Sequence, residues 1–118
     1  MDLEKLCNEV LDSDAHIRFT GILNSRGDLE IEKNKADTPL LTDDEVKMSV
    51  HYTYERWNRL QNLEHRLGKE KVSFTEYENV AIMSIVMGKN LFLLSVDPDV
   101  DYSKIISSTK EIIKKYEN

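Results

Sequence analysis

The fold is decided by the stretch VAIMSIVMGKNLFLLSV, residues 80–96. Each half of this stretch is apolar at nearly every position, and Ser84 is the exception in the first half. Gly88-Lys89-Asn90 between the halves supplies a compact hairpin turn. Strands that are apolar on both faces are typical of a sheet that helices cover on both sides. The stretch therefore predicts two neighbouring antiparallel strands within such a sheet.

A first amphipathic helix is expected over residues 2–12. Its apolar residues recur at spacings of three and four along one stripe: Leu3, Leu6, Cys7, Val10 and Leu11. A β-hairpin follows. Ile17, Phe19 and Leu23 alternate with polar residues at period two, which predicts a strand. Residues 24–28 supply the turn, and a short alternating second strand begins after them.

The middle of the chain predicts one long helix. Residues 42–45 fit a capping box, in which the Thr42 side chain accepts from the amide of Glu45 while Glu45 reaches back. The helix is expected to run to Leu67, with Gly68 as its left-handed cap. Residues 34–40 before it are polar and are expected to form a loop.

The remaining elements are an edge strand from Val72 to Tyr77 and a final helix that starts near Asp101. The whole chain, residues 1–118, is then a single α+β domain with the order α-β-β-α-β-β-β-α. The predicted architecture is a three-layer sandwich around a five-stranded antiparallel sheet. The middle helix lies on one face and the two terminal helices lie together on the other.

Composition narrows the classes of function. The chain has 118 residues, 16 Lys and Arg against 22 Asp and Glu, a net charge of -6 and one cysteine. This acidic balance argues against nucleic-acid and acidic-membrane partners, and residues 55–71 offer only a local charge of about +2 to oppose it. Because one cysteine forms no internal disulfide and no signal peptide opens the chain, a cytoplasmic location is expected.

The order of eight elements, together with the hairpin at residues 17–29, resembles the roadblock, longin and profilin-like superfold. Within it, residues 17–19, 40–45 with 48–49, and 90–101 resemble a family of small archaeal proteins of uncharacterised function. The roadblock resemblance implies a homodimer, in which middle helices meet and edge strands pair, and a platform for a small GTPase or another protein partner. It brings no catalytic residues and no cofactor, and fold alone does not imply function.

No metal site is expected. Three acids have the spacing of the first ligands of a calcium loop: Asp97, Asp99 and Asp101. The sixth position of that loop requires Gly and is Tyr102, and the twelfth requires Glu and is Ser108. The three histidines have no spacing that joins any pair on one helix: His16, His51 and His65.

No enzyme is expected either. The four glycines form no phosphate-binding loop. Cys7 falls on the apolar stripe of the first helix and is expected to be a buried hydrophobe. The acids at residues 43–45 are explained by helix capping. The sequence therefore offers no catalytic residue.

Protein interaction is the leading hypothesis. One face of the middle helix is expected to cover the sheet: Val46, Ser49, Val50, Thr53, Tyr54, Trp57, Leu60 and Leu67. Apolar residues and arginines remain on the opposite side: Met48, Tyr52, Arg56, Arg59, Leu63 and Arg66. This composition is typical of a protein interface, although scattered exposed apolar residues are common. Val72 and Phe74 on the edge strand complete the expected interface.

The alternative hypothesis is a small-molecule sensor with a pocket between the sheet and the middle helix. Four residues would line it: Phe19, Gly21, Tyr54 and Trp57. In that case Gly21 leaves room for a ligand beside its strand. The simpler explanation is that Gly21 lets the helix approach the sheet.

Overall fold

The structure is a computed structural model that describes residues 1–35 and 40–117. Residues 36–39 of the expected loop lie outside the described part. The elements, in chain order, are α1 (Leu3–Ser13), β1 (Ile17–Leu23), β2 (Leu29–Asn34), α2 (Asp43–Leu60), the 3-10 turn η1 (Gln61–Leu63), α3 (Glu64–Leu67), β3 (Val72–Glu76), β4 (Ala81–Met87), β5 (Asn90–Val96) and α4 (Tyr102–Tyr116). No helix among the described residues is long and apolar enough to span a membrane.

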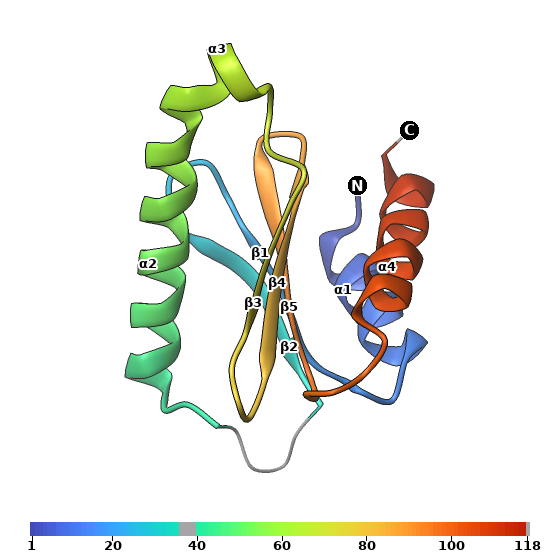
Figure 1. Cartoon of the computed structure of the whole chain (residues 1–118). Helices are drawn as coiled ribbons and strands as arrows, with labels where there is room; N and C mark the ends of the chain where they lie inside the picture. Colours follow the sequence, from blue (N-terminus) through green and yellow to red (C-terminus); the bar gives the residue numbers. More distant parts are fainter. Residues whose placement is uncertain (36–39, 118) are drawn as a thin grey trace.

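The five strands form one antiparallel sheet in the order β2-β1-β5-β4-β3. Helix α2 lies along one face of this sheet, and α1 and α4 lie side by side on the other (Figure 1). The predicted three-layer α+β sandwich is therefore confirmed. The β4–β5 hairpin occupies the inner part of the sheet, as the two-sided apolar pattern of residues 80–96 indicates.

The capping box predicted at residues 42–45 and the helix start predicted near Asp101 are confirmed, and Asp2 caps α1 in a similar way. Asp2 and Asp101 each accept a hydrogen bond from the backbone amide three residues later. At α2 the full capping box forms, with 3.2 Å from the Glu45 amide to the Thr42 hydroxyl and 2.9 Å from the Thr42 amide to the Glu45 carboxylate. These contacts satisfy amides that a helix leaves unpaired, so they fix where each helix begins.

The face covered by α1 and α4 holds the main core. Its buried members come from both helices and from the three inner strands β1, β4 and β5, and those without any notable exposure include Leu6, Cys7, Val10, Ile17, Ile22, Met83, Phe92, Leu94 and Val96. The buried Thr20 hydroxyl donates to the carbonyl of Cys7 at 3.0 Å. Burial raises the pKa of the Cys7 thiol to about 11, so the thiol is protonated at neutral pH.

A polar contact joins α1 to α4 at the surface of this layer. Glu9 accepts hydrogen bonds from Lys115 and from the Tyr116 hydroxyl, the latter at 2.6 Å. These bonds lower the pKa of Glu9, and the bond to Glu9 raises the pKa of Tyr116 to about 12. The carboxylate and the phenol therefore stabilise each other's neutral-pH form across the two terminal helices.

The face covered by α2 holds a smaller cluster. Only Val50 and Trp57 of α2 are buried there, against Leu23, Leu91 and Leu93 of the sheet. The expected burial of Leu60 and Leu67 is wrong, since both are exposed. The helical path also does not continue straight to residue 67. It tightens into η1 and then α3, because the residues beyond Trp57 no longer have the sheet beneath them.

The simple alternation expected along β1 is wrong at its start. The pairing with β5 shifts between Ile17 and Phe19, where two residues of β1 pass one of β5. This β-bulge turns the Ile17 side chain to the α1–α4 core, while Phe19 and Leu23 pack toward α2. A bulge of one residue reverses which face each side chain meets.

Candidate interaction surface

The outer face of α2 and η1 carries the apolar residues that the sequence singled out. We define Met48, Tyr52 and Leu63 as the outer strip. Their exposed fractions are 54%, 63% and 44%. Leu67 in α3, which was expected to cover the sheet, is 78% exposed at the same end of the molecule. The apolar surface near α3 is therefore larger than the sequence pattern predicted.

Arg56 does not belong to the outer strip. Its guanidinium turns toward β3, where it donates to the Ser73 hydroxyl at 2.7 Å and to both carboxylate oxygens of Glu70 at 3.3 and 3.4 Å. Ser73 in turn meets the buried Ser84 hydroxyl at 3.0 Å. Arg56 therefore helps to hold α2 over the β3 side of the sheet. The sequence position alone gave no sign of this, because residue 56 lies at the border of the helix face.

The two edge strands differ in their protection against pairing with another strand. β2 carries Glu30, Glu32 and Lys33 along its six residues, and charges of this kind discourage strand addition. β3 has the sequence VSFTE, with Glu76 as its only charge. Its Val72 is half-buried and its Phe74 is 42% exposed. β3 is thus the less protected edge of the sheet.

Charges of opposite sign lie at the two ends of the α2–β3 side. We define the acidic end as the exposed acids that begin α2 and end β3, namely Asp43, Asp44, Glu45, Glu76 and Glu78. We define the basic end as the exposed residues near α3 and the start of β3, namely Arg59, Arg66, Lys69 and Lys71. α2 and β3 run in opposite directions, so the start of α2 and the tip of the β3–β4 hairpin lie at one end of the molecule (Figure 1).

Four charges of the opposite sign interrupt this arrangement. Lys47 lies near the acidic end and Glu64 near the basic end, Glu55 pairs with Arg59 at 3.3 Å, and Glu70 is occupied by Arg56. Sequence reasoning found the local positive balance of residues 55–71 but did not pair it with the acids at residues 43–45. Both groups of charges can be read from the sequence, but their placement at opposite ends of one side depends on the opposite directions of α2 and β3.

The residues of the expected sensor pocket share one side of the sheet. Trp57 is buried in the α2 cluster, with Phe19 and Tyr54 packed against it. The tip of the Phe19 ring lies about 3.0 Å from where a Gly21 side chain would begin, so the ring occupies the room beside Gly21. Tyr54 extends to the β1–β2 turn, where its hydroxyl donates to the Ser25 carbonyl at 3.2 Å.

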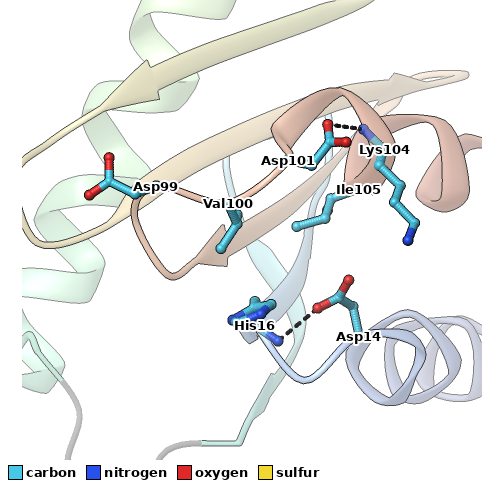
Figure 2. A pocket seen from close by; sticks show the side chains of 7 residues that line it. All are labelled: Asp14, His16, Asp99, Val100, Asp101, Lys104 and Ile105. Carbon is cyan, nitrogen blue, oxygen red and sulfur yellow. Dashed lines mark hydrogen bonds between the residues drawn. The ribbon is translucent and has the colours of Figure 1, made fainter.

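A hollow of about 320 Å³ lies elsewhere, between the α1–β1 loop and the start of α4. Figure 2 shows its seven lining side chains, which are Asp14, His16, Asp99, Val100, Asp101, Lys104 and Ile105. Asp14 accepts from the His16 backbone amide, and Asp101 accepts from the Lys104 backbone amide. These carboxylates therefore serve the backbone of the loop and the helix start.

The three acids with calcium-loop spacing have separate structural roles. Asp97 contacts His16 at 3.3 Å and Arg18 at 3.2 Å, Asp101 caps α4, and Asp99 points away from the other side chains of the hollow (Figure 2). In the described part of the chain, no three His, Cys, Asp or Glu side chains come together as a metal site would require.

Known structures share this architecture. A roadblock/LC7 domain from Streptomyces avermitilis is 12% identical and superposes with a TM-score of 0.76, covering 98% of this chain and 94% of its own. The chain has the roadblock/LC7 fold. An MglB protein described with a tetrameric arrangement is 15% identical, with a TM-score of 0.78 over 96% of this chain and 83% of its own. Profilin II from Acanthamoeba castellanii is 6% identical, with a TM-score of 0.64 over 97% and 95%.

No protein-family model matches the sequence, and no curated protein matches it. Identities of 6–15% with the solved structures establish a shared roadblock and profilin-like fold. The recognition of this superfold from the order of the elements is confirmed. The function of the chain has to be argued from its own surface.

Proposed function

We propose that the chain is a non-enzymatic homodimer that serves as a protein-interaction platform in the cytoplasm. Two copies meet through the outer strip, the neighbouring arginines Arg59 and Arg66, and the β3 edge with Val72 and Phe74. The observation that carries this proposal is the separation of charge between the acidic end and the basic end of the α2–β3 side.

Twofold symmetry explains why this separation favours a second copy as the partner. In a twofold dimer the same surface serves both subunits. An axis perpendicular to α2 places the basic end of one copy against the acidic end of the other, and does so twice. The parallel arrangement would bring like charges together. Complementary potentials of this kind steer association and select orientation more than they add affinity.

The exposed apolar residues of this surface would be buried in the dimer and would supply affinity that the charges alone do not supply. Tyr52 lies between Met48 and the basic end, and aromatic residues and Met flanked by Arg are enriched at interfaces. Pairing of β3 with its copy would satisfy the outward backbone groups of the less protected edge. Lys71 at the start of β3 would then approach Glu76 or Glu78 of the second copy.

A further protein partner would use the surfaces that the dimer leaves free. The resemblance to roadblock proteins implies a small GTPase as this partner. The tetrameric arrangement of an MglB protein supports the broader idea that this fold assembles with copies of itself. No nucleic acid, membrane, metal or cofactor is part of the proposal.

Light scattering after size-exclusion chromatography, at micromolar concentration, tests the homodimer. The wild-type chain is expected to have twice the mass of one chain. Tyr52→Asp buries a carboxylate in the apolar strip and should yield the monomer, and Leu63→Asp should act in the same direction. Asn58→Asp is the matched control, because it adds the same charge on an exposed position one turn after Tyr54, on the flank of α2 away from β3.

The control is expected to remain dimeric. A wild-type chain that is monomeric throughout this concentration range would contradict the proposal. So would a dimer that Tyr52→Asp and Leu63→Asp both leave intact. Circular dichroism of each variant separates loss of the dimer from loss of the fold.

A further inference from the structure

An aromatic pair of one exposed and one half-buried ring lies on the opposite side of the sheet from α2. Phe74 of β3 and Tyr102 in the first turn of α4 have ring centroids 4.8 Å apart, with their planes tilted by 52°. Phe74 is 42% exposed although its cross-strand partner Met83 is fully buried. The pair remains open to solvent because β3 is the outermost strand, so the layer of terminal helices ends beside it.

Two carboxylates flank this aromatic pair. Glu76 shares the face of Phe74, since side chains two positions apart on a strand point the same way. Burial, and then the neighbouring Glu76 carboxylate, raise the pKa of the Tyr102 hydroxyl. Asp99 lies close to the same hydroxyl, because its backbone amide donates to the Tyr102 hydroxyl at 2.7 Å.

The backbone of Asp99 is held in an unusual conformation. Its φ of 61° is the one positive value at a non-glycine residue among those that the structure describes. The hydrogen bond to Tyr102 keeps the loop in this form, and Figure 2 shows the Asp99 side chain directed away from the hollow. We define Phe74, Glu76, Asp99 and Tyr102 as the aromatic–acidic patch.

The charges of the patch are not neutralised within the described chain. No ion pair among residues 1–35 and 40–117 includes Glu76 or Asp99. In contrast Asp97, two residues earlier, contacts both His16 and Arg18. An exposed ring and a half-buried ring beside carboxylates that form no ion pair make a surface complementary to a cation, since the face of a ring and a carboxylate both attract positive charge.

We propose that the aromatic–acidic patch binds an arginine side chain carried by an extended segment of another protein. A guanidinium is planar, so it stacks on an aromatic ring while its outer N–H groups donate to carboxylates. A lysine ammonium offers the same charge without the planar surface. The patch lies apart from the outer strip on α2, but Phe74 and Glu76 also belong to the surface proposed for the homodimer, so an arginine side chain and a second copy of the chain would compete for these two residues.

A titration followed by nitrogen-15 NMR tests this proposal on the full chain at low salt. The probe is the peptide acetyl-Gly-Arg-Gly-Arg-Gly-amide. A second peptide has lysine in place of both arginines. A third has citrulline, whose side chain keeps the planar shape of arginine and lacks its charge. The arginine peptide is expected to shift the backbone signals of residues 74–76 and 99–102, and the citrulline peptide to bind roughly fivefold more weakly or worse.

Two variants separate the patch from general attraction to an acidic protein. Asp99→Asn keeps a residue that tolerates positive φ and should weaken arginine-peptide binding roughly fivefold. Asp12→Asn makes the same chemical change at an exposed site on α1 and should leave binding unchanged. Light scattering on the same samples reports whether either change affects the dimer, so failure of one proposal is distinguishable from failure of the other.

Three results would overturn the assignment of an arginine site. One is a set of signal shifts spread evenly over the acidic surface. Another is equal weakening of peptide binding by Asp12→Asn and Asp99→Asn. The third is no peptide binding together with a change in dimer mass in Asp99→Asn, which would mean that a second copy of the chain covers the patch.

Discussion

The two faces of the sheet differ in how many apolar side chains their helices bury. The α1–α4 face buries apolar side chains from both helices and from the sheet, many with no exposure at all. On the other face, α2 buries only Val50 and Trp57, and it is held at its flanks by Tyr54 on the β1–β2 turn and by Arg56 on β3. The first face therefore supplies most of the stability, while the second carries a helix whose outer side remains available to a partner.

Two neighbouring residues of β5 test directly whether the two faces of the sheet differ in their contribution to stability. Leu94 is fully buried toward α1 and α4, whereas Leu93 is 6% exposed toward α2, opposite Gly21 and Ser84. Leu94→Ala is expected to lower the free energy of unfolding by about 3–5 kcal/mol and Leu93→Ala by about 2–3 kcal/mol, because α2 can settle into the space. Urea denaturation measures both, and equal losses would contradict the account.

The contact between Gly27 and the Tyr54 ring tests how the α2 side of the sheet is stabilised. Gly27 has a φ of 88°, and a side chain there would begin 3.1 Å from the Tyr54 ring. Gly27→Ala is expected to cost about 1–2 kcal/mol of unfolding free energy. Gly88→Ala is the control, since Gly88 has a φ of 62° and no neighbour within 4 Å. A smaller loss of unfolding free energy at Gly88 would show that the Tyr54 contact adds to the cost at Gly27, and an equal loss would contradict this.

One buried hydroxyl tests whether the α1–α4 face depends on apolar packing. The Thr109 hydroxyl of α4 is buried without a hydrogen-bond partner in the described structure. Thr109→Val keeps the shape and removes the unpaired group, so it should raise the free energy of unfolding by about 1 kcal/mol. Thr20→Val is the matched comparison and should lower it, because the Thr20 hydroxyl donates to Cys7. Destabilisation by both would show an overlooked partner for Thr109.

The contact between Glu9 and the end of α4 predicts the smallest effect, which depends on pH. The pKa of Glu9 in the folded state lies below its ordinary value of 4.5, so its contribution is present above pH 4.5 and is lost as the pH falls through the folded-state value. Glu9→Gln should lower the melting temperature at pH 7 by on the order of 1–2 °C, and less at pH 3. The exposed Glu111→Gln should show no such pH dependence.

The features that could be predicted from the sequence are those that depend on nearby residues. The helix starts at Asp2, Thr42 and Asp101 follow from capping chemistry within three positions. The inner hairpin of residues 80–96 follows from its apolar composition. Composition and spacing also identified Met48, Tyr52 and Leu63 as exposed, because the opposite side of the helix was needed for the sheet.

The features that were wrong depend on how distant elements meet. The bulge between Ile17 and Phe19 arises from pairing with β5, and the end of α2 at Leu60 arises where the sheet no longer lies beneath the helix. Arg56 turns inward because Ser73 and Glu70 come within reach. The charge separation required the relative directions of α2 and β3, which no local pattern contains.

A charge-reversal exchange tests the proposed antiparallel dimer most directly. One variant cancels most of the charge of the acidic end by Asp44→Lys and Glu78→Lys, and the other cancels the charge of the basic end by Arg66→Glu and Lys69→Glu. All four sites are exposed and lie outside the capping box. We expect each variant alone to be monomeric by light scattering and the equimolar mixture to form a dimer containing one copy of each. Dimers of either variant alone, or a mixture that stays monomeric while both variants are folded, would contradict the account.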